Sequence, residues 1–244
     1  HIVAEQEFEL GVACLAATRT VASQERAEGQ QALVITLHRP EEPAAGHRLE
    51  GIGIAEYNEQ PMVGAMLHSL AFGSTLHYVT DEEDRKELSR KQLEMTADVM
   101  AHSLLYWTRD LYHGGMLQQG SRIYAMSSEG AILAVPTYGA VSAAKAALEA
   151  HVRQLALELA HAGITVNAVR AGVTDTPALR HIPGWQQLVE AAIARNPSAR
   201  LTTPQDVADA LTVLATPQTH WMTGNVIGID GGEVMGSRES AEIP

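Results

Sequence analysis

One predicted helix carries two side chains that could act together on a substrate oxygen. Tyr138 and Lys145 stand seven positions apart in the segment YGAVSAAKAALEAHVRQLALELAHAG, residues 138–163. Seven residues make about two helical turns, so both side chains can face the same cleft. A tyrosine hydroxyl can give a proton to a substrate oxygen or take one from it, and a nearby ammonium group steadies the charge. Without further context such a pair is usually structural, so its surroundings matter.

Strand-like and helical runs alternate along the chain, which predicts an α/β fold. We expect a Rossmann-like, doubly wound parallel sheet with helices on both faces. Strands are expected at residues 1–4, 32–38, 51–57, within 62–73, and at 122–128, 164–172 and 225–232. Helices are expected over about 10–27, over about 91–113, over 138–163 and over 203–216. Residues 1–235 should form a single domain, and residues 236–244 a frayed tail.

The composition is that of a globular protein and excludes several functions. Of 244 residues, 45% are hydrophobic and 19% are charged, with a net charge of −12. That charge argues against nucleic acid and against acidic membranes, and no apolar run reaches the ~20 residues of a membrane span. The one cysteine, Cys14, favours a buried thiol and a cytoplasmic setting. No histidine pair has the spacing of a helical zinc site, so no metal is expected.

From residue 62 onward the order of motifs resembles the short-chain dehydrogenase/reductase superfamily. The motifs are LHSLAFG at 67–73, YGAVSAAK at 138–145, VNAVRAGVTDT at 166–176 and GNVIGIDGG at 224–232. Ordinary members of that superfamily keep the tyrosine and lysine four positions apart. The seven-residue spacing here, together with the HSLAF segment, resembles the enoyl-thioester reductases.

The resemblance implies a role for each matching residue. Tyr138 and Lys145 match the catalytic pair, and Ser128 matches the hydrogen-bonding serine at the end of its strand. The backbone around Val173 and the hydroxyl of Thr176 would hold a nicotinamide carboxamide. Residues 174–197 match the substrate lid, and its apolar side chains suit an acyl or aromatic group: Leu179, Ile182, Trp185 and Leu188. The indole of Trp185 is equally consistent with packing inside the lid.

The first third of the chain departs from the superfamily pattern. The cofactor loop of the superfamily has the pattern T-G-x-x-x-G-x-G. Aligned by spacing, Ala4 takes the threonine position, Glu5 and Glu9 take two glycine positions, and Gly11 remains. Side chains there would fill the space of the diphosphate, and with Glu7 they would bring negative charge to it. Glutamates also cap helix N-termini well. The sequence therefore predicts a former phosphate loop and no cofactor in this chain.

The segment between the second and fourth expected strands is shortened. It contains Pro40, Pro43 and Pro61, so at least one flanking helix is expected to be missing. Asn58 stands where an aspartate often meets the adenine. In contrast, Arg39 follows the second expected strand, where a basic residue could accept the 2′-phosphate of NADPH. An exposed arginine at this place is also consistent with simple solvation.

Three functions remain open from the sequence. The first is a cofactor-less subunit that assembles with an active paralogue, as a heterotetramer, into an oxidoreductase acting on an acyl (CoA-type) thioester. Members of the superfamily pair through long helices that correspond to residues 91–113 and 138–161. The second is an active NAD(P)H-dependent enoyl- or hydroxyacyl-thioester reductase or dehydrogenase that uses Tyr138 and Lys145. The third is a non-redox enzyme, an isomerase or lyase, of the same fold.

Overall fold

The computed structural model describes residues 63–180, 182 and 184–235, except the side chains at 177 and 178, together with the backbone of four short strands before them. The expected phosphate loop with Gly11 lies outside the described residues. So do Cys14, Arg39 and Asn58, the strand expected at 1–4 and the tail at 236–244. The assignment of residues 1–235 to one domain stays a prediction.

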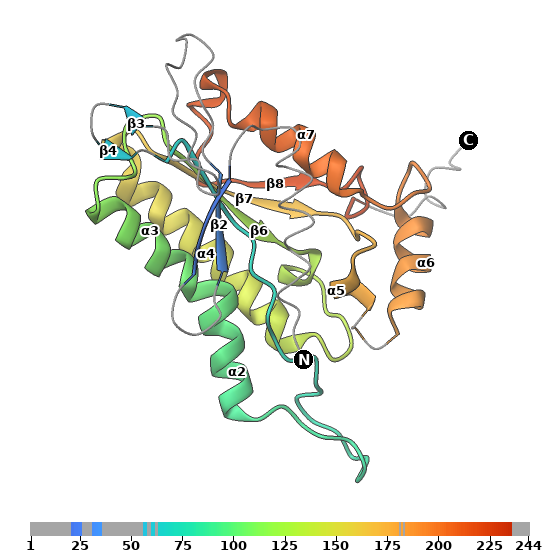
Figure 1. The fold of residues 1–244 in the computed structure, drawn as a ribbon. Coiled ribbons are helices and arrows are strands. Elements are labelled where there is room, and N and C mark those ends of the chain that lie inside the picture. The colour runs from blue at the N-terminus through green and yellow to red at the C-terminus, as the bar shows by residue number, and fades with distance from the viewer. Residues whose placement is uncertain are drawn as a thin grey trace.

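The main sheet has six strands in the order β1-β2-β5-β6-β7-β8 (Figure 1). Their bounds are Val21–Glu25 for β1, Gln31–Ile35 for β2, Ala65–His68 for β5, Arg122–Ser127 for β6, Thr165–Ala171 for β7 and Val226–Ile229 for β8. Strands β5 to β8 are parallel to one another. With helices on both faces of these strands, the expected Rossmann-like α/β class is confirmed.

Two details of the amino-terminal part were expected differently. The helix expected over about 10–27 is wrong at Val21–Glu25, which form strand β1. The sheet is also not parallel throughout, because β1 pairs antiparallel with β2 and β2 antiparallel with β5. Residues 26–30 alone connect β1 to β2, and a link that short suits antiparallel strands, since a parallel crossover needs about a dozen residues or more.

A second, two-stranded sheet lies within the segment that was expected to be shortened. Of the strand expected at 51–57, residues Glu56–Tyr57 form β3. This strand pairs with β4, Gln60–Pro61, and not with the main sheet.

Helices cover both faces of the parallel strands (Figure 1). On one face lie α2 and α3, joined by a π-helical turn, and α4; on the other face lies α7. The α-helical bounds are Arg90–Ala97 for α2, Ser103–His113 for α3, Gly139–Leu159 for α4, Pro177–Arg180 for α5, Trp185–Arg195 for α6 and Pro204–Leu214 for α7. The π-helical turn spans Asp98–His102, and short 3-10 turns occur at Glu129–Ala131, Ala160–Ala162 and Pro217–Thr219. The expected helices from residue 91 onward are thus confirmed. None of the helices that the structure describes is both long and apolar enough to cross a membrane.

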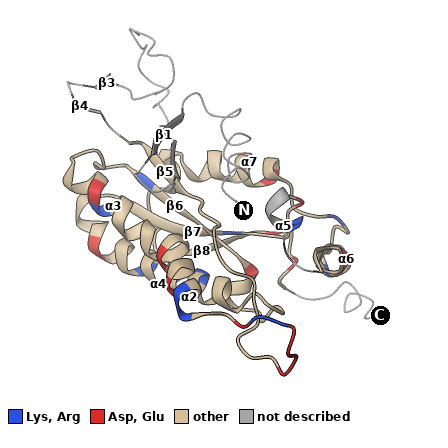
Figure 2. Ribbon diagram, turned by 60° about the horizontal axis from the view of Figure 1, so that its bottom comes forward, with Lys and Arg blue, Asp and Glu red and all other residues tan. Residues whose placement is uncertain are grey.

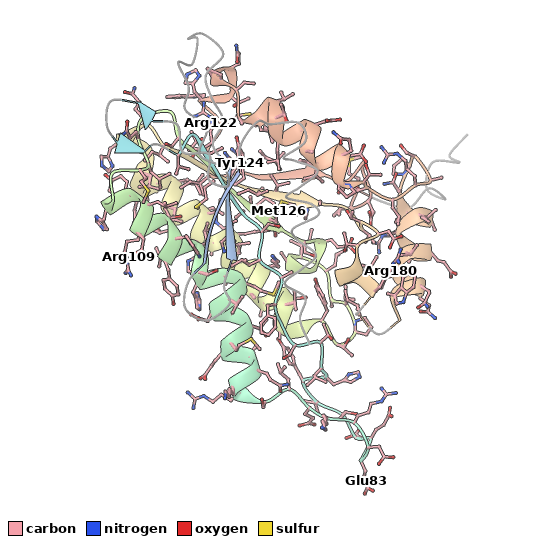
Figure 3. The ribbon with its side chains drawn as sticks, viewed as in Figure 1. Glu83, Arg109, Arg122, Tyr124, Met126 and Arg180 are labelled. Atoms are coloured by element: carbon pink, nitrogen blue, oxygen red, sulfur yellow. The ribbon has the colours of Figure 1, made fainter. Side chains whose placement is uncertain are left out.

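The core follows from the two-residue repeat of the strands. Along β6, Ile123 and Ala125 pack with α4, whereas Tyr124 and Met126 pack with α7. Figure 3 shows Tyr124 and Met126 following Arg122 along this strand. Because both faces are covered, all six residues of β6 are buried. This rigid strand ends at the place where Ser128 begins the candidate site.

Acidic charge gathers on the loop between β5 and α2. The loop projects from the body, and Asp81, Glu82, Glu83 and Asp84 form its acidic tip (Figure 2). In Figure 3 the side chain of Glu83 lies far from Met126 at the end of β6. The acidic tip is therefore remote from the edge of the sheet where the candidate residues meet.

Candidate active site

One cavity of about 290 Å³ lies at the carboxyl edge of the parallel strands. Most of the predicted site residues line it: Ser128, Tyr138, Lys145, Val173, Thr176, Leu179, Ile182 and Leu188. They come from the loops after β6 and β7, from the start of α4 and from the lid that contains α5 and α6. The structure therefore brings together predictions that are up to 60 residues apart in the chain. Of the other three predictions, Trp185 lies outside the cavity lining, and Gly11 and Arg39 are not among the described residues.

Helix α4 places Tyr138 and Lys145 along the same wall. Tyr138 is the residue that precedes the first turn of α4, and Lys145 lies two turns further in. The Lys145 side chain is 5% exposed, and its Nζ donates to the carbonyl oxygens of Met126 at 2.8 Å and Leu70 at 3.3 Å. These two carbonyls stand at the ends of β6 and β5, so the backbone of two parallel strands fixes the ammonium beside the cavity.

A neutral histidine lies behind Lys145. His68, the last residue of β5, is fully buried, and burial, together with the positive charge of Lys145, lowers its pKa to about 3. Ser103 donates its only hydroxyl proton to the Val99 carbonyl, so it accepts from Nε2 of His68 at 2.8 Å. The ring is therefore the Nε2–H tautomer and adds no second cation to the site. Among the described residues, no three His, Cys, Asp or Glu side chains are arranged to hold a metal.

Two serines at the carboxyl end of β6, Ser127 in the strand and Ser128 directly after it, make different hydrogen bonds. The hydroxyl of Ser127 donates to Oε1 of Glu149 at 2.6 Å, which ties β6 to α4 one turn beyond Lys145. The hydroxyl of Ser128 accepts from the Gly130 N–H at 3.1 Å, which leaves its own proton for a second acceptor. A Cβ on Gly130 would approach the Tyr138 ring to 2.9 Å. Glycine at 130 thus allows the phenol ring of Tyr138 to lie directly against the backbone of this turn.

The loop after β7 is packed too tightly for any residue but glycine at 172. A Cβ there would clash with the Thr202 hydroxyl and would lie 2.8 Å from Oε2 of Glu233. The next N–H, that of Val173, donates to the same Glu233 oxygen at 3.1 Å. The group predicted to meet a nicotinamide carboxamide therefore has an acceptor inside the protein. The Thr176 hydroxyl accepts from the Leu179 N–H at 3.3 Å and begins α5.

The lid contributes apolar side chains on one side and an ion pair on the other. Leu179, Ile182 and Leu188 line the cavity. Trp185 does not, because its ring packs 5.8 Å from the guanidinium of Arg180. Arg180 in turn makes two 2.9 Å hydrogen bonds to Asp175. For Trp185 the structure therefore favours packing within the lid over contact with a ligand.

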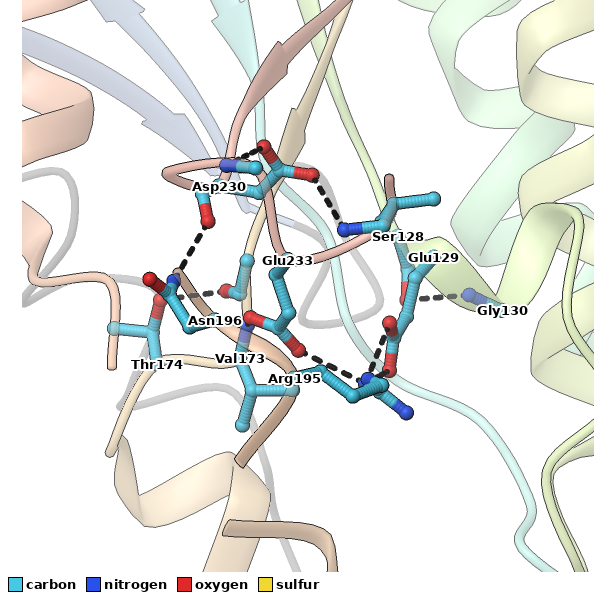
Figure 4. Close-up of polar contacts among 12 residues, drawn as sticks. Ser128, Glu129, Gly130, Val173, Thr174, Arg195, Asn196, Asp230 and Glu233 are labelled. Atoms are coloured by element: carbon cyan, nitrogen blue, oxygen red, sulfur yellow. Dashed lines mark hydrogen bonds and ion pairs between the residues drawn. The ribbon is translucent and has the colours of Figure 1, made fainter. Parts of the chain in front are cut away.

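Sequence reasoning missed Glu129, which lines this cavity, and the two charged residues linked to it, Arg195 and Glu233. Figure 4 shows Arg195 between the two carboxylates. Its Nη2 lies 2.9 Å from Oε2 of Glu129 and 2.9 Å from Oε1 of Glu233. None of the three residues belongs to a motif of its own. The available signal was position: Glu129 directly follows Ser128, and Glu233 directly follows the final Gly-Gly pair.

A family model described as enoyl-(acyl carrier protein) reductase matches residues 59–233. The chain belongs to this family. The predicted resemblance to short-chain enoyl-thioester reductases from residue 62 onward is thereby confirmed. One similar protein is the NADH-dependent enoyl-[acyl-carrier-protein] reductase FabI of Aquifex aeolicus. That enzyme is 33% identical over 174 residues, which are 70% of this chain and 62% of the relative.

A further relative and two solved structures are also similar to this chain. The 1-cyclohexenylcarbonyl-CoA reductase of Streptomyces collinus is 35% identical over 119 residues, 48% of this chain and 42% of the relative. The crystal structure of the Aquifex enzyme superimposes with a TM-score of 0.63 at 31% identity, covering 70% of this chain and 65% of that one. The FabI–NADH complex of Alistipes finegoldii gives 0.67 at 22% identity, over 75% and 64% of the two chains, and supports the fold alone. The chain thus spans less than two thirds of the length of the Aquifex and Streptomyces enzymes.

The described residues fit a dinucleotide cofactor only in part. Lys145 and Thr176 line the cavity where a nicotinamide would meet a substrate. The diphosphate of a dinucleotide normally sits at the N-terminus of a helix that follows a parallel strand of the sheet. Here the neighbour of β5 is β2, which runs in the opposite direction. Within the described part of the sheet, β5 has no parallel strand directly beside it on that side, so these described strands do not supply the usual diphosphate site.

Proposed function

We propose that this chain is an acyl-thioester-binding subunit of a short-chain oxidoreductase, and that it assembles with an active paralogue. The observation that carries the proposal is the contrast at one sheet edge. Tyr138 and Lys145 line a cavity with an apolar lid, whereas the strand beside β5 runs against the direction that a diphosphate site needs. The names of the Aquifex and Streptomyces relatives support an acyl thioester as the ligand class.

The cavity offers two donors to a thioester carbonyl. The Tyr138 hydroxyl donates to the carbonyl oxygen, and Ser128 donates its remaining proton to the same oxygen. Lys145, fixed by two backbone carbonyls, stabilises the negative charge that polarisation places there. The acyl group lies against Leu179, Ile182 and Leu188, whose burial favours an apolar chain or ring.

The partner in this proposal rests on the resemblance stated above. Helices α2, α3 and α4 correspond to the helices through which members of the superfamily pair. A NADH or NADPH molecule would then be held in the paralogue, where an intact glycine loop would supply its diphosphate site. The tetrameric assembly and the location in the cytoplasm belong to the same proposal.

Two titrations of the purified chain test the proposal. In the first, NADH and NADPH are added while nucleotide fluorescence and heat are followed, and we expect no saturation up to about millimolar cofactor, a binding free energy weaker than about 4 kcal/mol. In the second, crotonyl-CoA, an unsaturated acyl-CoA, is added alone, and we expect saturable binding. Saturable micromolar binding of either nucleotide would contradict the cofactor-less assignment. Failure of crotonyl-CoA to bind would contradict the thioester site.

A second function is favoured by one observation. Lys145, which matches the catalytic lysine of the superfamily, and Thr176, which matches its carboxamide-binding residue, line the same cavity as Tyr138. In this alternative the chain is itself an NAD(P)H-dependent enoyl-thioester reductase. NADH-dependent reduction of crotonyl-CoA by the isolated chain would select it over the first proposal.

A further inference from the structure

Three chain segments around the cavity are joined by one ionic cluster (Figure 4), which we call the clasp and define as Glu129, Arg195 and Glu233. Glu129 follows β6 and lines the cavity beside Ser128. Arg195 is the last residue of lid helix α6. Glu233 follows β8, and its side chain is only 1% exposed. The clasp therefore links the lid to the cavity-lining loop after β6 and to the loop after β8.

Glu233 holds more than the lid arginine. One carboxylate oxygen accepts from Nη2 of Arg195 at 2.9 Å, and the other accepts from the Val173 N–H at 3.1 Å. Val173, which directly precedes the lid segment, also lines the cavity. The same carboxylate also explains the glycine at 172, because a Cβ there would lie 2.8 Å from Oε2. One buried side chain thus fixes the backbone wall and the lid at once.

The charges show that the clasp holds the protein together and does not capture an anion. Nη2 of Arg195 already meets Oε1 and Oε2 of Glu129 at 3.0 and 2.9 Å as well as Glu233. Two carboxylates around one guanidinium repel a phosphate or carboxylate ligand. Charge-assisted hydrogen bonds of this kind are among the stronger ones in proteins, so the cluster is suited to fixing geometry.

A neighbouring hydrogen bond also connects the end of α6 to the loop after β8. Asn196, directly after Arg195, donates from Nδ2 to the Asp230 carbonyl at 2.9 Å. Asp230 in turn accepts from the Gly232 N–H at 2.9 Å and orders the turn that carries Glu233. The end of α6 and the loop after β8 are therefore fastened by both a neutral and an ionic contact.

We propose that Glu233 is a positioning residue that holds lid helix α6 against the Val173 wall of the cavity. Its use in thioester binding rests on the proposed function, but the coupling itself does not. In Glu233→Gln one of the two accepting oxygens becomes an NH2 group and the charge is lost, so the side chain can no longer accept from the Val173 N–H and from Arg195 at once, and both segments open more often. Loss of the Glu129 charge weakens only the hold on Arg195 and leaves Val173 bonded.

Hydrogen exchange of the full chain, followed by mass spectrometry, separates these effects. In Glu233→Gln we expect the amides of α6 and of Val173 to exchange at least about tenfold faster than in the wild type, with the centre of α4 unchanged. In Glu129→Gln only α6 should accelerate. Arg90→Gln removes an exposed ion pair with Glu94 on α2 and serves as the matched control, with no change at either place.

A double variant tests whether the two residues act through each other. If Glu233 holds α6 through Arg195, then Glu233→Gln with Arg195→Gln should accelerate exchange in α6 no more than the larger single change. The proposal would be overturned if the amides of α6 and Val173 in Glu233→Gln exchanged at the wild-type rate, or if those of α4 accelerated equally. If Glu233→Gln does not fold, the test is hydrogen exchange of Glu129→Gln, and an unchanged exchange rate in α6 of that variant overturns the proposal.

Binding of crotonyl-CoA connects the clasp to the site. The dissociation constant of Glu233→Gln should rise about tenfold, which corresponds to about 1.4 kcal/mol, and that of Arg90→Gln should not change. An unchanged constant in Glu233→Gln, with binding intact in the wild type, overturns the role in ligand binding. If the wild type itself fails to bind, the proposed function fails, while the exchange measurements still decide whether the clasp couples the lid to Val173.

Discussion

Strands β5 to β8 and strand β2 share one sheet but present different ends to a ligand. Each parallel strand brings its carboxyl end to the same edge, where residues after β5, β6 and β7 line the cavity. Strand β2 does the reverse, since Ile35 at its carboxyl end pairs with Ala65 at the start of β5. The carboxyl end of β2 therefore lies at the edge of the sheet opposite to the one that carries the cavity.

This difference in strand direction separates two requirements of a dinucleotide-dependent reductase: groups that polarise the substrate carbonyl, and a site for the diphosphate of the cofactor. A polarised carbonyl needs a few donors and an apolar lid, and loops after parallel strands can supply both. A dinucleotide also needs a strand, a tight turn and a helix N-terminus at the same edge. The first set of groups can thus be present at strands whose antiparallel neighbour does not provide the second.

The largest effect is expected from a change in the hydrophobic core between α4 and the parallel strands. Leu148 on α4 is fully buried against the sheet. Leu148→Ala should lower the free energy of unfolding by about 2–5 kcal/mol, measured by urea denaturation. The matched control is Leu157→Ala on the same helix, because Leu157 is 74% exposed and should change stability by less than about 0.5 kcal/mol. Equal effects of the two changes would break the distinction.

A smaller effect is expected at the crowded loop after β7. Gly172→Ala places a methyl group against the Thr202 hydroxyl and Glu233. Such overpacking typically costs about 1–3 kcal/mol, and we expect that loss in the urea midpoint at constant slope. The control is Gly228→Ala on β8, where a Cβ comes no nearer than 3.7 Å to its neighbours. If Gly172→Ala is as stable as Gly228→Ala, the loop is not held as tightly as described.

The tyrosine separates the two candidate functions. If this chain only binds the thioester, Tyr138→Phe removes one hydrogen bond to the carbonyl, worth about 0.5–1.5 kcal/mol. Calorimetry should then show crotonyl-CoA binding weakened by up to about tenfold, with turnover by the assembled oxidoreductase unchanged. Tyr112→Phe, on α3, is the control. A fall in turnover of about 100-fold or more would instead identify Tyr138 as a working general acid.

The site could be predicted from sequence where local patterns determine it. Tyr138 and Lys145 follow from helical spacing within a recognisable motif, and β6 follows from a continuous buried run. Strand β1 could not be predicted in the same way, because its polar sequence VASQE becomes a strand through pairing with β2. The clasp was also beyond local patterns, since Arg195 lies 66 positions from Glu129 and 38 from Glu233.

The smallest expected effect is a dependence of stability on pH at the clasp. Burial raises the pKa of the Glu233 carboxyl above its ordinary value of 4.5, even though Arg195 and the Val173 N–H favour its charged form. The folded protein therefore binds this proton more tightly than the unfolded chain does. Its contribution to stability is fully present below the ordinary pKa and is lost as the pH rises through the raised value. Urea denaturation of the wild type and Glu233→Gln across that interval should show their difference falling with increasing pH and then levelling. A difference that rises with pH would mean that the ion pair with Arg195 outweighs the cost of burial, and Glu233 would then hold the lid more firmly as the charge appears.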